Sequence, residues 1–104
     1  MAYQIYTFPY SCPAFTTQWP QTPYTISGGT IVSIGFQNEG GAQEFWVSQM
    51  FVVNQTQAYL QVVNQSPSST SYNVVIVVDI GDSATDITAS KPDMDSAPVA
   101  QKPR

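Results

Sequence analysis

The chain has 104 residues, the size of one domain with a single hydrophobic core. Charged residues make up only 10% of it, against about 25% in an ordinary soluble domain. No Lys, Arg or His occurs before Lys91, so the body of the protein has no cationic side chain to neutralise phosphates. This absence excludes nucleic-acid binding and attraction to anionic membranes, and the weakly charged surface favours self-association.

Residues 1–24 are rich in both aromatic residues and proline. A first strand is predicted over 2–8, because its residues are largely aromatic or β-branched. Beyond it, each proline biases the residue before it to an extended conformation and lacks a backbone donor. We therefore expect an extended segment there rather than a regular central strand. This segment either covers the core of its own domain or forms an arm that lies on a neighbouring subunit.

Four further strands are predicted between residues 25 and 80, separated by residues typical of turns. They span 30–36, about 43–53, 57–64 and 71–80. In the last of these, one face is entirely large and apolar, and the opposite face is apolar at its centre. Such a strand is typical of the middle of a sandwich, or of a sheet that another subunit covers.

The predicted fold is all-β: a small antiparallel β-sandwich, jelly-roll-like or immunoglobulin-like, with a small closed barrel as the alternative. The domain covers residues 1–81, including the extended segment 1–24. Residues 82–104 hold few large apolar side chains and cannot bury enough surface to offset their ordering entropy. We therefore expect a disordered C-terminal tail, which either keeps the protein soluble or docks on another chain.

The residue types leave little room for catalysis. Without histidine the nucleophile–histidine arrangements are impossible, and the lack of any lysine before Lys91 argues against Schiff-base mechanisms. Glu39 and Glu44 flank a glycine turn, where two solvated carboxylates explain them better than a catalytic pair. One cysteine and scattered carboxylates provide no metal site apart from a weak oxygen-ligand Ca²⁺ site. We expect no enzymatic activity, no metal and no cofactor.

Cys12 is the only cysteine, so it forms no disulfide within the chain. A buried small hydrophobic residue is the favoured interpretation, and a free thiol or half of an intersubunit bridge are the others. The chain starts without the basic and apolar regions of a signal peptide, and its longest apolar run, 74–78, is five residues long. These features predict cytoplasmic synthesis without membrane insertion, or a mature sequence. An extracellular or particle assembly stays open.

The sequence predicts a function by contact rather than by chemistry. We expect a structural or interaction protein that self-associates into a homo-oligomer or larger assembly, or that binds other protein subunits. The candidate contact residues are aromatic: Tyr10, Phe15, Trp19, Tyr24 and Trp46. The alternative is a lectin-like, carbohydrate-binding module, in which aromatic rings stack on sugars and polar side chains satisfy the hydroxyls. The polar contacts would come from Asn38, Glu39 and Gln43.

Overall fold

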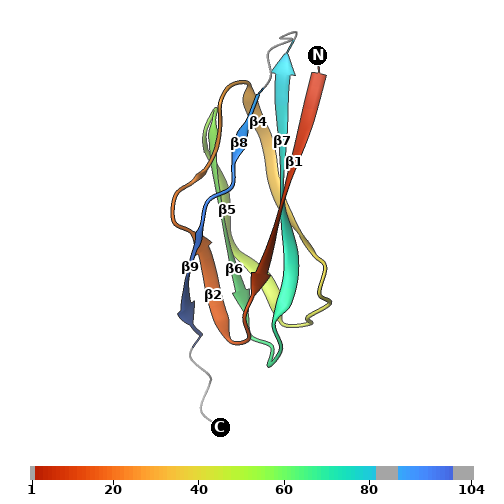
Figure 1. Cartoon of the computed structure of the whole chain (residues 1–104), viewed down its shortest axis with the longest axis vertical. Helices are drawn as coiled ribbons and strands as arrows, with labels where there is room; N and C mark the ends of the chain where they lie inside the picture. Colours follow the sequence, from red (N-terminus) through yellow and green to blue (C-terminus); the bar gives the residue numbers. More distant parts are fainter. Residues whose placement is uncertain (1, 82–86, 100–104) are drawn as a thin grey trace.

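A computed structural model describes residues 2–81 and 87–99. All elements of these residues are strands, which form two antiparallel sheets packed face to face along the long axis of the molecule (Figure 1). The prediction of a small antiparallel β-sandwich is therefore confirmed.

The first sheet has three strands in the order β1-β7-β4, which span Ala2–Cys12, Thr70–Gly81 and Thr30–Asn38. β7 lies in the middle and pairs along its whole length with β1. Its inward row is the one that the alternation predicted: Tyr72, Val74, Ile76 and Val78 are all buried. Val75 and Val77, on the opposite face, are partly exposed, so no second layer covers that face within the described chain.

The second sheet is built around β6 (Gln57–Asn64). β5 (Phe45–Asn54) pairs with one side of β6. On the other side lie β2 (Thr16–Pro20) and β3 (Tyr24–Ile26), one after the other along β6. β9 (Met94–Pro98) and β8 (Ala89–Ser90) then pair with β2 and β3. Prolines lie in the gap between β2 and β3 and in the gap between β8 and β9, because proline provides no N–H for the ladder.

Alternate residues of the two sheets meet in one core. In β6, Ala58, Leu60, Val62 and Asn64 point inward and are buried. They face the inward rows of the first sheet across the sandwich, with Phe8, Ile31 and Ile34 among them. The period of two along each strand places one row in the core and leaves the other outside.

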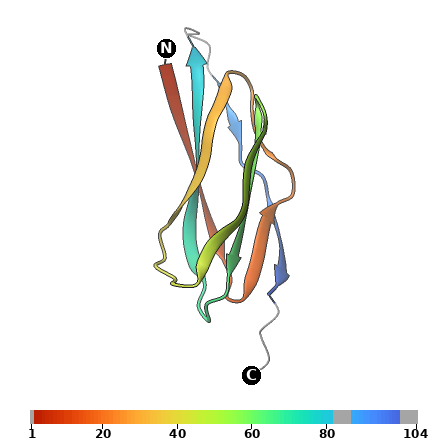
Figure 2. The ribbon, with the colours of Figure 1, turned by 180° about the vertical axis from the view of Figure 1, so that it is seen from behind.

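The N-terminal segment is part of both sheets, so of the two alternatives it covers the core of its own domain and forms no arm on a neighbouring subunit. The expectation that it forms no central strand is wrong, because β2 and β3 each lie between two other strands. β1 continues past the predicted 2–8 to Cys12, and Pro9 fits because β1 is an edge strand. β2 and β3 complete the segment inside the second sheet, and Figure 2 shows the arrow of β2 beside that of β9. The aromatic residues of this segment are therefore divided between the two sheets.

The prediction of a disordered tail is wrong for residues 87–99. β8 and β9 extend the second sheet, and Pro92 between them is buried. Two tyrosines of β1 donate hydrogen bonds to this segment: Tyr6 Oη to the Ile87 carbonyl at 2.6 Å and Tyr10 Oη to the Pro92 carbonyl at 3.0 Å. Backbone pairing and these contacts order a segment that has few apolar side chains. Residues 82–86 and 100–104 of the predicted tail lie outside the described residues.

Candidate interaction surface

Strand β5 presents an uncovered apolar surface. Every residue from Ser48 to Asn54 is exposed, whereas Phe45 at its start is buried. Met50 and Phe51 are 50% and 49% exposed. Val52 and Val53 follow them, so four successive large apolar residues lie at the surface. Contiguous apolar residues of this kind are typical of an interaction site.

The register with β6 shows how these side chains lie. Residues directly opposite in an antiparallel pair share a face. Met50 is opposite Leu60, so it lies on the inward face, beyond the part that the first sheet covers. Phe51 is opposite Tyr59 on the outer face, where the two rings stack with their centroids 5.3 Å apart. β5 is therefore apolar on both faces.

β5 is also an edge strand, since no strand of residues 2–81 and 87–99 lies on its far side. An edge leaves backbone N–H and C=O groups free to pair with another strand, and most proteins block it with prolines, charges or bulges. The segment 45–54 has no proline, glycine or charged residue. Its register shifts lie at Ser48 and Val53, and they leave the stretch 49–52 regularly paired. This stretch is an unprotected edge.

The other edges of the two sheets are less suited to pairing. β1 contains the exposed Pro9, and β4 has a register shift next to Val32 as well as exposed residues after it that are all polar. The outer row of β8 and β9 is interrupted at Pro92 and contains Asp95. Each of these features opposes the addition of a strand. Among the described edges, β5 is therefore the most open.

The outer face of the second sheet carries both tryptophans that the sequence singled out. Trp46 is opposite Val63, which is also opposite Thr17, so these three share the outer face. Trp19 lies two residues after Thr17 on the same strand and therefore points the same way. Trp46 is 41% exposed and Trp19 is half-buried.

Tyr24 is not at an interface, contrary to the prediction. Its ring is fully buried and stacks on Phe8, because β3 pairs with β6 and turns this residue inward. Tyr10 is half-buried against Tyr24 and Tyr72, and the Lys91 Nζ lies 4.8 Å from its ring centroid. Both residues hold the domain together, and desolvation raises the pKa of both hydroxyls.

Phe15 shapes the turn between β1 and β2. Its φ of 52° lies in the left-handed region, which is unusual for a bulky residue. Its N–H donates to the Ser66 carbonyl at 3.2 Å, and its carbonyl accepts from the Val99 N–H at 2.8 Å. Phe15 therefore joins three segments by its backbone, and its half-buried side chain is no free contact surface.

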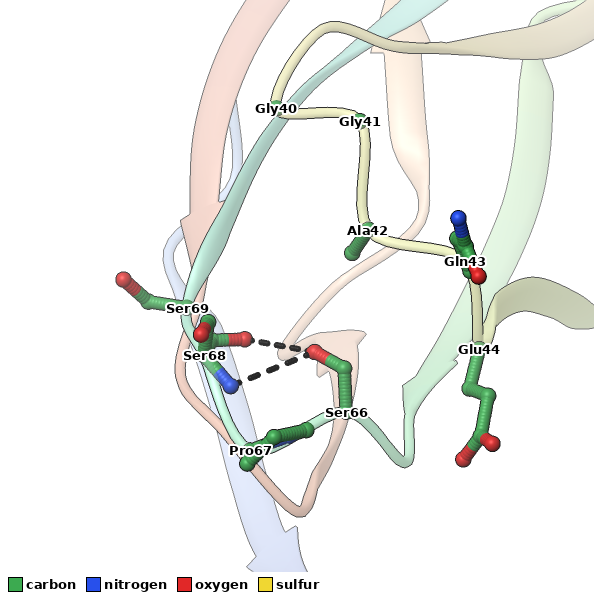
Figure 3. A pocket seen from close by; sticks show the side chains of 9 residues that line it. All are labelled: Gly40, Gly41, Ala42, Gln43, Glu44, Ser66, Pro67, Ser68 and Ser69. Carbon is green, nitrogen blue, oxygen red and sulfur yellow. Dashed lines mark hydrogen bonds between the residues drawn. The ribbon is translucent and has the colours of Figure 1, made fainter.

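The predicted sugar-contacting residues lie at the connection between β4 and β5. A pocket of about 400 Å³ opens here between residues 40–44 and 66–69 (Figure 3). The Asn38 side chain is already hydrogen-bonded within the protein. Its Nδ2 donates to the Ala42 carbonyl, and its Oδ1 accepts from the Gly41 N–H and the Thr70 hydroxyl. Glu39 accepts from Asn73 Nδ2 at 3.0 Å. Gln43 is exposed at the rim, and Tyr24 is buried away from any such site.

Asn64 is a buried polar residue whose importance the sequence analysis missed. Its Nδ2 donates to the carbonyls of Cys12, Pro13 and Ser68 at 3.0–3.2 Å. Its Oδ1 accepts from the Ser66 N–H at 3.0 Å and from the Ser66 hydroxyl at 2.7 Å. One amide thereby ties the β1–β2 turn and the β6–β7 loop to the end of β6. The cluster of serines after Asn64 was the available signal.

Cys12 is fully buried, which confirms the favoured interpretation and makes the intersubunit bridge wrong. Its Sγ donates to the Thr16 carbonyl at 3.5 Å. Burial raises the pKa of the thiol to about 11, so it stays protonated and unreactive near neutral pH.

The described residues contain no group of three or more His, Cys, Asp or Glu side chains placed to hold a metal. None of them forms a helix long and apolar enough to span a membrane. No protein-family model, curated protein or solved structure matches this chain. The most distinctive feature of the described surface is the exposed apolar edge strand β5.

Proposed function

We propose that this chain is a non-catalytic structural subunit that associates with further copies of itself through β5. The observation that carries the proposal is the row of exposed apolar residues, 50–53, on an unprotected sheet edge. In water this row costs free energy at about 25 cal/mol for each Å² of apolar surface, and a partner strand removes that cost while it satisfies the backbone.

The charge distribution supports the same proposal. From Phe45 to Gln65 the chain has no charged residue, so the whole β5–β6 hairpin approaches a second copy without local repulsion. Lysine is a common protection for an edge strand, and the first lysine of this chain is Lys91.

The test is the solution mass over a concentration series, by light scattering coupled to size-exclusion chromatography. We expect a mass above that of the 11.4 kDa monomer, which rises with concentration. Phe51→Lys is expected to return the protein to a monomer, and Gln37→Lys on β4, with the same change in charge, to leave the assembly intact. Wild-type protein that stays a monomer throughout, or equal effects of the two variants, would overturn the proposal.

Carbohydrate binding is a second candidate, and the outer face of the second sheet favours it. Phe51 and Tyr59 lie stacked beside Gln61, which accepts from the Tyr59 hydroxyl at 3.0 Å. Rings and amides on one flat face are suited to stacking on sugars and to bonding their hydroxyls. Quenching of tryptophan fluorescence across a panel of glycans tests this, with Trp46→Ala as the variant expected to abolish the response. A panel without any response counts against it.

A further inference from the structure

We infer that two copies of this chain pair antiparallel through β5, about a two-fold axis at Phe51. This inference rests on the proposed function and adds the partner strand, its direction and its register. It would join the second sheets of two copies into one continuous sheet, in which the row Tyr59–Phe51 is extended by the same row of the partner.

The charges select the antiparallel direction. Glu44 directly precedes β5, and the hairpin that follows is uncharged up to Gln65. In a parallel, in-register pair the two Glu44 carboxylates would lie about 5 Å apart. In an antiparallel pair centred on Phe51 they lie roughly 45 Å apart, well beyond the screening length of about 10 Å. Only the antiparallel pair avoids this repulsion.

Symmetry limits the possible registers. Opposite residues of an antiparallel pair share a face, and neighbours along a strand alternate between faces. A two-fold axis between identical strands keeps the same faces on the same side of the sheet. The axis must therefore pass through a residue that lies opposite its own copy, and not between two residues.

Packing then selects Phe51 among the candidates. With the axis at Phe51, Met50 and Val52 pair with each other across the interface, and all the central pairs are apolar. With the axis at Met50, Phe51 would lie opposite the polar Gln49. With the axis at Val52, the pairing would depend on Val53, where β5 loses its regular register. The Phe51 axis also places two aromatic rings side by side on the outer face, an arrangement that favours association.

Cysteine cross-linking under mild oxidation tests this register. Position 50 lies opposite position 52 of the partner, so an equimolar mixture of Met50→Cys and Val52→Cys chains is expected to form a disulfide-linked dimer. In either chain alone the two introduced cysteines are offset by about 7 Å along the strands and about 5 Å across them, so their Cα atoms lie about 8 Å apart, beyond the separation of about 7 Å that a disulfide bridges. Each alone is expected to stay unlinked.

The mixture is the decisive sample, because both of its chains retain Phe51. Wild-type protein is the control for Cys12, which is buried and is expected to remain unlinked. If light scattering shows an assembly but the mixture gives no more disulfide than the single chains, the register is wrong and the proposed function stands. If wild-type protein is a monomer at all concentrations, both fail.

Discussion

Strands β5 and β6 are joined by a tight turn and paired along their length, but the fold places them in opposite environments. In β6 every second residue is buried, and Leu60 is only 1% exposed. Its register partner Met50 in β5 is 50% exposed, on the same face of the same sheet. Both strands are rich in large apolar residues, so hydrophobicity does not account for the difference.

The order of the strands accounts for it. β6 has neighbours on both sides and the first sheet beneath it, whereas β5 is an edge, and its second half lies beyond the covered part of the sandwich. An apolar strand in the centre of a sheet indicates a core, and the same strand at an edge indicates a missing partner. Substitutions at matched covered and uncovered positions should therefore differ in their effect on stability.

The largest effect is expected at the buried end of β6. Asn64→Ala removes the donor to three carbonyls and the acceptor for Ser66, and leaves the buried groups among them, at Cys12 and Ser66, without that partner. We expect the free energy of unfolding to fall by about 4 kcal/mol, measured by urea denaturation. Asn54→Ala, the matched change at the exposed end of β5, is expected to cost less than about 1 kcal/mol. Equal losses would remove the distinction between the two strands.

A core deletion and its register partner give the next effect. Leu60→Ala leaves a cavity between the sheets and is expected to cost about 3 kcal/mol. Met50→Ala, directly opposite on β5, removes a side chain that is half in water and is expected to cost less than about 1 kcal/mol of monomer stability. Chemical denaturation at a concentration where the protein is monomeric measures both. A comparable loss for Met50→Ala would show that β5 is already covered within one chain.

The sequence predicted the covered parts of the fold better than the uncovered ones. The strand 57–64 was predicted with its observed bounds, because the turn residues that flank it define its two ends. Tyr24 lies in the same proline-rich segment as the half-buried Phe15 and Trp19, and only the pairing of β3 with β6 turns it inward. Composition does not contain that information.

The tail shows the opposite failure. Residues 87–99 have too few apolar side chains to predict order, but their order comes from backbone pairing with β2 and β3. The hydroxyls of Tyr6 and Tyr10 that hold this segment are 81 and 82 residues away from their acceptors in sequence. Contacts at that separation leave no local pattern. The exposure of β5 could not be predicted from the sequence either, because it depends on which strands pair and not on the residue types of β5.

A pH titration tests whether the covered groups are as buried as the packing indicates. The pKa of Cys12 is raised from its ordinary 9.0 to about 11, and desolvation also raises the pKa of Tyr24 and Tyr72. The folded protein therefore keeps protons that the unfolded chain releases, so stability is full below pH 9 and is lost as the pH rises towards 11. We expect Cys12 alone to lower the free energy of unfolding by about 2 kcal/mol over that range, and the two tyrosines to add to this loss.

The measurement is the urea midpoint at each pH, with tyrosinate absorbance recorded in parallel. A cysteine introduced at the exposed Val53 is the contrasting group, and it should react with a thiol reagent near neutral pH while Cys12 does not. Stability that stays constant from pH 9 to pH 11 would contradict the burial of these groups.

The smallest effect concerns the two edges of the second sheet. On the side opposite β5, the outer row is held to β1 by the Tyr6 and Tyr10 hydroxyls. Tyr10→Phe deletes one hydrogen bond and keeps the ring, so it is expected to cost about 1 kcal/mol. Amide hydrogen exchange should become faster in residues 87–99 and stay unchanged in β6, because a bond to one segment protects that segment first. Tyr59→Phe, which removes a hydroxyl bonded to Gln61 on the outer face, is the control. Exchange in 87–99 that is the same in both variants would mean that strand pairing alone holds this edge, as the pairing with β6 holds β5 at the other edge.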